Sequence, residues 1–300
     1  MTENEYLQAV LTSQTIEENG PELKELRSRR LEVEKLLRQY FDGSNPTIRY
    51  GGSKAKGTMI REAYDLDVIC YFPREDDEAG KSLKEIYEET RTALQEKYFV
   101  EPKGVALRIG GGQKENLRVD FHIDVVPGRF TDDSKTDAYL YKPSGDKERM
   151  KTNLDTHISH VKDSDVTDAI RLLKLWRVRN SVSVKHFALE LFTIDLLKRK
   201  KSAGMATRLK HVWTELRDRV DEIVIEDPAN PTGNDLSELL STSVRAGLSE
   251  VARGTLQRIE DQGWESVFGP VDTMSEDEKT AALGRVAVSV PNPSKPWRSE

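Results

Sequence analysis

Two aspartates that flank one apolar residue, shortly after a glycine-rich loop, are the feature that most limits what this chain can fold into. Residues 51–58 read Gly-Gly-Ser-Lys-Ala-Lys-Gly-Thr, and Asp65 and Asp67 open an apolar run that ends at Phe72. Because side chains alternate between the two faces of a strand, both carboxylates would lie on the same face. Such a pair can hold the same divalent cations, which metal-dependent nucleotidyl transfer requires.

The loop offers groups that suit a phosphate. Gly51 and Gly52 let the backbone approach an anion closely. Ser53 can cap a helix that begins near Lys54, with its hydroxyl and nearby amides turned toward the phosphate, and Lys54 and Lys56 add positive charge. A Gly-Gly-Ser triplet alone is a weak signal. Followed by two acids inside an apolar run, it predicts a nucleotide-binding loop.

A strand predicted over residues 118–127 offers a third carboxylate. Its apolar residues alternate with Asp120, His122 and Asp124, so these polar side chains would share one face. A strand over residues 105–109, followed by three consecutive glycines that suggest a turn, leads into it. We therefore expect a hairpin that brings a third acid beside the first two.

These motifs resemble a known family. Gly-Ser, Asp-Leu-Asp and Asp-Val-Val-Pro, in this order, are similar to the polymerase-beta-like nucleotidyltransferases, specifically the branch with oligoadenylate synthases, cyclic GMP-AMP synthase and the bacterial CD-NTases. Residues 169–176 and 186–192 resemble the helical core that follows the catalytic domain in this branch. The Asp-Pro-x-x-Pro-x-x-Asn run of residues 227–234 resembles its later turn. The resemblance covers residues 45–270.

The resemblance implies a set of metal ligands. Asp65 and Asp67 would bridge two Mg²⁺ ions, which Mn²⁺ can replace, and Asp124 would complete one of them and accept the hydroxyl proton. One metal would activate a ribose hydroxyl and the other would neutralise the leaving pyrophosphate. Asp120 is the alternative third ligand, or else a hydrogen-bonded residue at the strand entrance. His122 is either packed in the strand or a partner of the ligands.

The resemblance also implies nucleotide-binding residues, to which Gly52 and Ser53 belong. Lys174 stands where the family has a lysine that contacts the donor triphosphate; the alternative is a lysine on a helix surface. Lys185 and His186 occupy the next such position, where relatives often carry serine or glutamine, so His186 is a departure. Three tyrosines are candidates for stacking on a base: Tyr64, Tyr139 and Tyr141.

Composition fits a soluble, cytoplasmic enzyme. The 300 residues carry a formal net charge of −6, which argues against a broad nucleic-acid-coating surface. Basic clusters at 27–30 and 198–201 are either solvated helix faces or local nucleic-acid contacts, and the first reading is favoured. No run approaches the length of a membrane span and the N-terminus lacks a secretion signal. Cys70, the single cysteine, is expected to pack in the core.

The pattern along the chain predicts a half with strands and helices, then an all-helical half, and an active site in the cleft between them. The resemblance implies that this is an α+β fold, with a mixed sheet and flanking helices of the polymerase-beta-like type. The expected domains are a catalytic domain over 1–160, a helical oligoadenylate-synthase-like domain over 161–285 and an irregular tail over 286–300. Residues 128–146 read as a polar surface segment. Helices are expected over 5–41 with a break near 19–21, and over 81–97, 166–179, 185–200, 205–223 and 236–262.

The resemblance implies a bacterial synthase that joins nucleoside triphosphates into a cyclic di- or trinucleotide messenger in anti-phage, CBASS-type signalling. The alternatives are a linear 2′-5′ oligoadenylate-like synthase activated by double-stranded RNA, a transferase acting on a macromolecule, and a catalytically silent sensor. A regulatory partner or activating ligand stays open, as do the bases, the linkage and the ring size.

Overall fold

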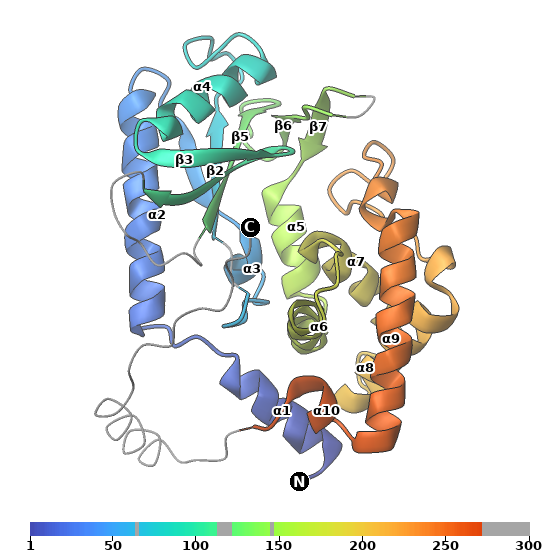
Figure 1. The fold of residues 1–300 in the computed structure, drawn as a ribbon. Helices are drawn as coiled ribbons and strands as arrows, with labels where there is room; N and C mark the ends of the chain where they lie inside the picture. The colour runs from blue at the N-terminus through green and yellow to red at the C-terminus, as the bar shows by residue number, and fades with distance from the viewer. Residues whose placement is uncertain (64–65, 113–121, 145–146, 272–300) are drawn as a thin grey trace, which may run out of the picture. The chain divides into compact units, whose positions relative to one another are not determined.

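The acidic residues lie on a mixed β-sheet whose strand order decides which of them meet. A computed structural model describes residues 1–63, 66–112, 122–144 and 147–271 (Figure 1). The strands follow the order β1-β2-β5-β4-β3, and β6 and β7 extend the sheet from β5. Only the β2–β5 pair is parallel among these strand pairs. The strands are β1 (Thr47–Tyr50), β2 (Leu66–Phe72), β3 (Tyr98–Lys103), β4 (Ala106–Gly112), β5 (His122–Phe130), β6 (Ala138–Tyr141) and β7 (Arg149–Thr152).

Helices precede, interrupt and follow the sheet. Met1–Gly269 forms one compact unit that contains all the helices of the described residues. They are α1 (Glu3–Ser13), α2 (Pro21–Tyr40), α3 (Gly52–Ala55), α4 (Leu83–Gln95), α5 (Leu154–Lys162), α6 (Thr167–Arg179), α7 (His186–Leu197), α8 (Met205–Asp218), α9 (Thr242–Gln262) and α10 (Glu265–Phe268), with 3₁₀ turns η1 (Val220–Glu222) and η2 (Ser237–Leu240). No helix in these described ranges is long and apolar enough to cross a membrane.

The two faces of the sheet are buried differently. On β2, Val68, Cys70 and Phe72 belong to a large apolar cluster that includes residues of α2 and α4, and Figure 1 shows both helices beside the sheet. Ile69 and Tyr71 point the other way, into a smaller cluster that reaches α5. Because side chains alternate along a strand, Asp67 shares the face of Ile69 and Tyr71.

The helical region has its own apolar centre. Helix α7 reads HFALELFTIDLL and buries residues on several sides, as expected for an inner helix that is apolar around most of its surface. Trp176 of α6 is fully buried and donates its indole N–H to Thr255 Oγ1 of α9 at 2.8 Å. The ring centroids of Trp176 and Trp213 of α8 lie 5.9 Å apart. Aromatic packing therefore joins α6 to α8, and the indole hydrogen bond joins α6 to α9.

The α+β class predicted from the sequence is confirmed, and several element boundaries are corrected. Glycines 110–112 continue β4 instead of forming a turn, and residues 128–146, expected as a surface segment, include the end of β5 and all of β6. The helix expected over 236–262 is broken at Ser241, whose side chain caps α9 by accepting a hydrogen bond from the backbone of Val244. The helix expected over 205–223 ends at Asp218 and continues as η1.

Candidate active site

Asp67 and Asp124 lie directly opposite each other on the parallel strands β2 and β5. Residues in register on neighbouring strands point to the same face, and adjacent strands are about 4.8 Å apart. Both residues are partly exposed, and the side chain of Asp124 retains 16% of its accessible surface. Two carboxylates are thus held close together at a site that solvent can reach. A cation close to both carboxylates would offset their mutual repulsion.

Arg108 of β4 supplies one such cation. It lies opposite Asp124 in the β4–β5 register, and its Nε and Nη2 donate to Asp124 Oδ1 and Oδ2, both at 2.8 Å. On the other side of Arg108, β3 places Glu101 in register with it. Glu101, Arg108, Asp124 and Asp67 therefore form one row across four strands on the same face, which we call the charged row.

The glycine-rich loop lies beside the Asp67 end of this row. The backbone N–H of Gly51 donates to the carbonyl of Asp67 at 3.1 Å. A Cβ atom added to Gly51 would lie 3.7 Å from Asp67 Cβ and 3.3 Å from Leu154 Cδ1 of α5. Gly52 begins α3 with a φ of +75°. The structure thus brings together the loop and two of the three acids that the sequence pairs with it.

Ser53 and the acids fit a divalent cation bound with a phosphate. Carboxylate oxygens are the ligands that Mg²⁺ prefers, and Asp67 and Asp124 present them side by side. The hydroxyl of Ser53 is buried and has no hydrogen-bond partner within the described chain, which leaves it available to a phosphate oxygen. The described residues contain no group of three metal-ligating side chains, and Asp65, the third expected ligand, lies outside them.

The backbone of Gly52 yields a testable prediction. A positive φ costs a residue with a Cβ about 1–2 kcal/mol, so Gly52→Ala is expected to lower the melting temperature. Gly247, inside α9, has no atom within 4 Å of an added Cβ, and Gly247→Ala is expected to raise it because alanine favours helix. Thermal unfolding followed by circular dichroism measures both shifts. A stabilising Gly52→Ala would contradict the described loop.

A buried cluster of charges joins the loop to the helical region. Glu190 of α7 is 2% exposed and Lys174 of α6 is 1% exposed. Lys174 Nζ lies 2.6 Å from Glu190 Oε1, and Lys56 Nζ lies 2.8 Å from Glu190 Oε2. Thr58 donates to Glu190 Oε1 at 2.9 Å and accepts from Lys174 Nζ at 2.8 Å. We call these four residues the buried ion cluster.

The cluster reaches the glycine-rich loop through the backbone. The N–H of Thr58 donates to the carbonyl of Ser53 at 2.8 Å, so hydrogen bonds through Thr58 connect Glu190 to the loop. Burial alone would raise the pKa of Glu190, but the ammonium groups of Lys56 and Lys174 outweigh burial and lower that pKa. The carboxylate therefore stays ionised and keeps both lysines in place.

The predicted nucleotide-binding lysines are in contrasting environments. Lys174 is buried in the ion cluster, whereas the sequence offered a phosphate contact or a helix-surface position. Lys185 is exposed at the residue before α7. The ring of His186 is partly buried, with its Nε2 at 2.9 Å from Arg177 Nη1. The structure thus commits His186 to a contact within the helical region.

The turn at residues 227–234 is a hydrogen-bonded junction. Asp227 is fully buried, and its carboxylate lies 2.7 Å from His157 Nε2 of α5 and accepts from Asn234 Nδ2 at 2.6 Å. Asn234 Nδ2 also donates to the carbonyl of Lys151 at 2.7 Å. Burial acts to raise the pKa of Asp227, but these hydrogen bonds outweigh it and the pKa is lowered. The motif thereby fixes the helical region to α5 and β7.

Sequence reasoning missed Arg108, Thr58 and Glu190. Glu190 could have been found, because it is an acid amid the apolar residues of α7, where a charge needs a partner. Among the candidate stacking residues, Tyr141 packs edge-on against Tyr87 with ring centroids 5.4 Å apart. Tyr64 and Asp120 lie outside the described residues, and the side chain of His122 is not described either.

The comparisons with known proteins concern the whole fold. No protein-family model matches the sequence, and no curated protein matches it. The structure of Escherichia coli CdnC with HORMA-deltaN aligns with a TM-score of 0.64, at 18% identity, over 90% of this chain and 98% of that one. The chain has the fold of the bacterial CD-NTases.

Other solved CD-NTases align in the same way. Bradyrhizobium diazoefficiens CdnG with GTP gives a TM-score of 0.62 at 14% identity, over 96% of this chain and 99% of that one. Vibrio cholerae DncV, a cyclic AMP-GMP synthase solved with nonhydrolyzable GTP, gives 0.58 at 18% identity, over 82% of this chain and 76% of that one. The matches confirm the CD-NTase fold that the sequence motifs predicted, a mixed sheet followed by a helical region.

Proposed function

We propose that this chain is a Mg²⁺-dependent nucleotidyltransferase that joins nucleoside triphosphates into a cyclic di- or trinucleotide. The observation that carries the proposal is the parallel register of Asp67 and Asp124 beside the glycine-rich loop, on a CD-NTase fold. Proteins of similar fold support the substrate class, since CdnC was solved with ATP and CdnG with GTP.

Asp65, Asp67 and Asp124 would hold the metal, and Mn²⁺ could replace Mg²⁺. The metal would supply activation of the attacking hydroxyl and charge neutralisation of the pyrophosphate. A ribose hydroxyl oxygen of one nucleotide forms a bond to the α-phosphorus of another, and the bond from that phosphorus to the bridging oxygen breaks. Pyrophosphate leaves with the electron pair, and the hydroxyl proton passes to Asp124 or to water.

Five residues are proposed to bind the nucleotide. Gly52 and Ser53 would contact the phosphates through the backbone and the buried hydroxyl. Lys174 would act through its charge and its hydrogen bond to Thr58, because its ammonium group is enclosed by the buried ion cluster. Lys185 and His186 would lie at the edge of the nucleotide site.

The cyclic product would act as a second messenger in anti-phage signalling in the bacterial cytoplasm. A regulatory partner is part of this proposal, since CdnC of similar fold was solved in complex with HORMA-deltaN. Activity of the isolated chain would then depend on supplying such a partner or an activating ligand.

Incubation with all four radiolabelled nucleoside triphosphates and Mg²⁺ or Mn²⁺, followed by phosphatase and mass spectrometry, tests the proposal. We expect a small phosphatase-resistant product whose mass identifies its bases. Linear products with free ends, stimulated by double-stranded RNA, would replace the proposal with an oligoadenylate-type synthase. Label transferred to added tRNA or protein would identify a macromolecular acceptor, and nucleotide binding without pyrophosphate release would indicate a silent sensor.

A further inference from the structure

The charged row contains an arginine between two carboxylates. Arg108 contacts Asp124 through two hydrogen bonds of 2.8 Å, and its other neighbour in register is Glu101. Residues opposite each other on antiparallel strands have Cα atoms about 5 Å apart. A long arginine side chain can reach a carboxylate on either neighbouring strand at that spacing.

We propose that Arg108 competes with the metal for Asp124 and moves toward Glu101 when a divalent cation binds, so that the free protein binds metal weakly. This inference rests on the proposed metal site. The guanidinium holds one lone pair on each oxygen of Asp124. It also places a positive charge beside the position that a cation would occupy. Both effects lower cation affinity, since ligand charge sets how tightly oxygen sites bind divalent ions.

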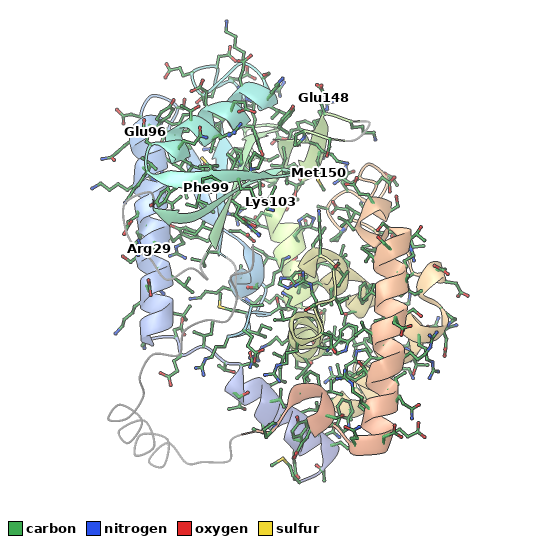
Figure 2. The ribbon with its side chains drawn as sticks, viewed as in Figure 1. Arg29, Glu96, Phe99, Lys103, Glu148 and Met150 are labelled. Carbon is green, nitrogen blue, oxygen red and sulfur yellow. The ribbon has the colours of Figure 1, made fainter. Side chains whose placement is uncertain are left out.

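Glu101 is suited to receive the displaced arginine. Its side chain is 50% exposed and lies 2.7 Å from Lys103 Nζ, whose own side chain is 44% exposed. An ion pair between exposed groups contributes little to stability, so Arg108 can replace Lys103 at low cost. Figure 2 labels Phe99 and Lys103 along β3, the strand at the end of the sheet that carries Glu101.

The competition has a functional consequence. A metal that arrives with the phosphates of a nucleotide gains further oxygen ligands and displaces the arginine readily, whereas free metal displaces it only weakly. The site would then be fully occupied only when nucleotide and cation are both present. Arg108 is a positioning residue in this account, because it acts through Asp124.

Binding of Mn²⁺ to the nucleotide-free protein, measured from the electron paramagnetic resonance signal of unbound Mn²⁺, tests the inference without using activity. Removing a positive charge beside a divalent cation strengthens binding even at an effective dielectric constant near 20, so we expect Arg108→Gln to bind Mn²⁺ at least about fivefold more tightly. Glu101→Gln removes the alternative partner, and we expect it to weaken Mn²⁺ binding about twofold or more.

Arg219→Gln is the matched control, because Arg219, the residue that follows α8, also pairs with a carboxylate, that of Glu215, at 2.9 Å. It is expected to leave Mn²⁺ binding unchanged. Unchanged or weaker binding by Arg108→Gln would overturn the competition. If Arg108→Gln does not fold, the variant Glu101→Gln at the exposed position is the deciding test. Mn²⁺ binding by Glu101→Gln that is unchanged or tighter than in the wild type would then overturn the proposal.

The same Mn²⁺ binding measurement distinguishes failure of the proposed metal site from failure of the competition. Asp67→Asn is expected to abolish the Mn²⁺ binding that the wild-type chain shows. Wild-type binding that does not depend on Asp67 would contradict the proposed function itself. Binding that depends on Asp67 but ignores Arg108 would contradict only the competition.

Discussion

An Asp67→Asn variant is expected to fold like the wild-type chain and to lose at least about a thousandfold in nucleotidyl transfer, or about 4 kcal/mol of transition-state stabilisation. The amide keeps the size of the side chain but removes the charge that would hold a cation between β2 and β5. Pyrophosphate release, measured over a range of nucleoside triphosphate concentrations, quantifies the loss. We expect kcat to fall more than KM rises, because the metal acts mainly in the transition state.

Asp261→Asn is the control for this prediction. Asp261 is exposed on α9 and bonds only to Gln257 among the hydrogen bonds of the described chain. The control should keep wild-type turnover. Melting temperatures of all three proteins should agree within a few degrees, so that loss of activity is not loss of fold. Activity retained by Asp67→Asn would remove Asp67 from the catalytic site.

A Glu190→Gln variant is expected to lose about 3–5 kcal/mol of the free energy of unfolding at pH 7. The substitution leaves the ammonium groups of Lys174 and Lys56 without their carboxylate, and the side chain of Lys174 is only 1% exposed. Two like charges then face each other out of water, which costs more than the lost hydrogen bonds alone. Urea unfolding followed by circular dichroism measures the difference.

The pH dependence of this difference has a definite sign. The pKa of Glu190 is lower in the folded state than in the unfolded chain. The stability that its charge contributes is therefore fully present above the unfolded pKa and is lost as the pH falls through the folded pKa. We expect the gap between wild type and Glu190→Gln to be constant near neutral pH and to shrink below the ordinary range of a glutamic acid. A gap that grows on acidification would contradict the ionised cluster.

Glu260→Gln provides the matched control, because Glu260 is exposed on α9 and forms no ion pair within the described chain. Such surface substitutions usually change stability by less than about 0.5 kcal/mol. If Glu190→Gln were equally neutral, the buried ion cluster would not hold the loop. We expect Glu190→Gln to lose more activity than the fraction of unfolded protein explains, since Thr58 connects Glu190 to Ser53.

Local sequence patterns predicted which face of the sheet Asp67 and Asp124 occupy, because the alternation of side chains along a strand alone decides it. The strand period places Asp67 on the face opposite Val68, and the alternating pattern around Asp124 does the same on β5. The hairpin that brings β4 beside β5 was also predicted. These features are set by residues close in sequence, so one sequence is enough to find them.

The remaining features depend on register and on distant contacts. Whether Arg108 meets Asp124 is decided by the pairing of β4 with β5, and a shift by one residue would turn it to the other face. The Lys174–Glu190 pair joins two helices, and Lys56 joins it from the loop. The spacing of apolar residues within one segment does not reveal contacts between residues that are far apart in the sequence. The strands β6 and β7 were missed because each has only four residues and they lie in or beside a polar, turn-rich stretch.

The proposal that Asp67 and Asp124 hold the catalytic metal is tested most directly by a crystal structure with Mn²⁺ and a nonhydrolysable ATP analogue, in which anomalous scattering locates the metal. We predict an Mn²⁺ peak ligated by carboxylate oxygens of both Asp67 and Asp124, with the triphosphate against the backbone of Gly52 and Ser53. Nucleotide bound with its metal away from these two aspartates would contradict the account.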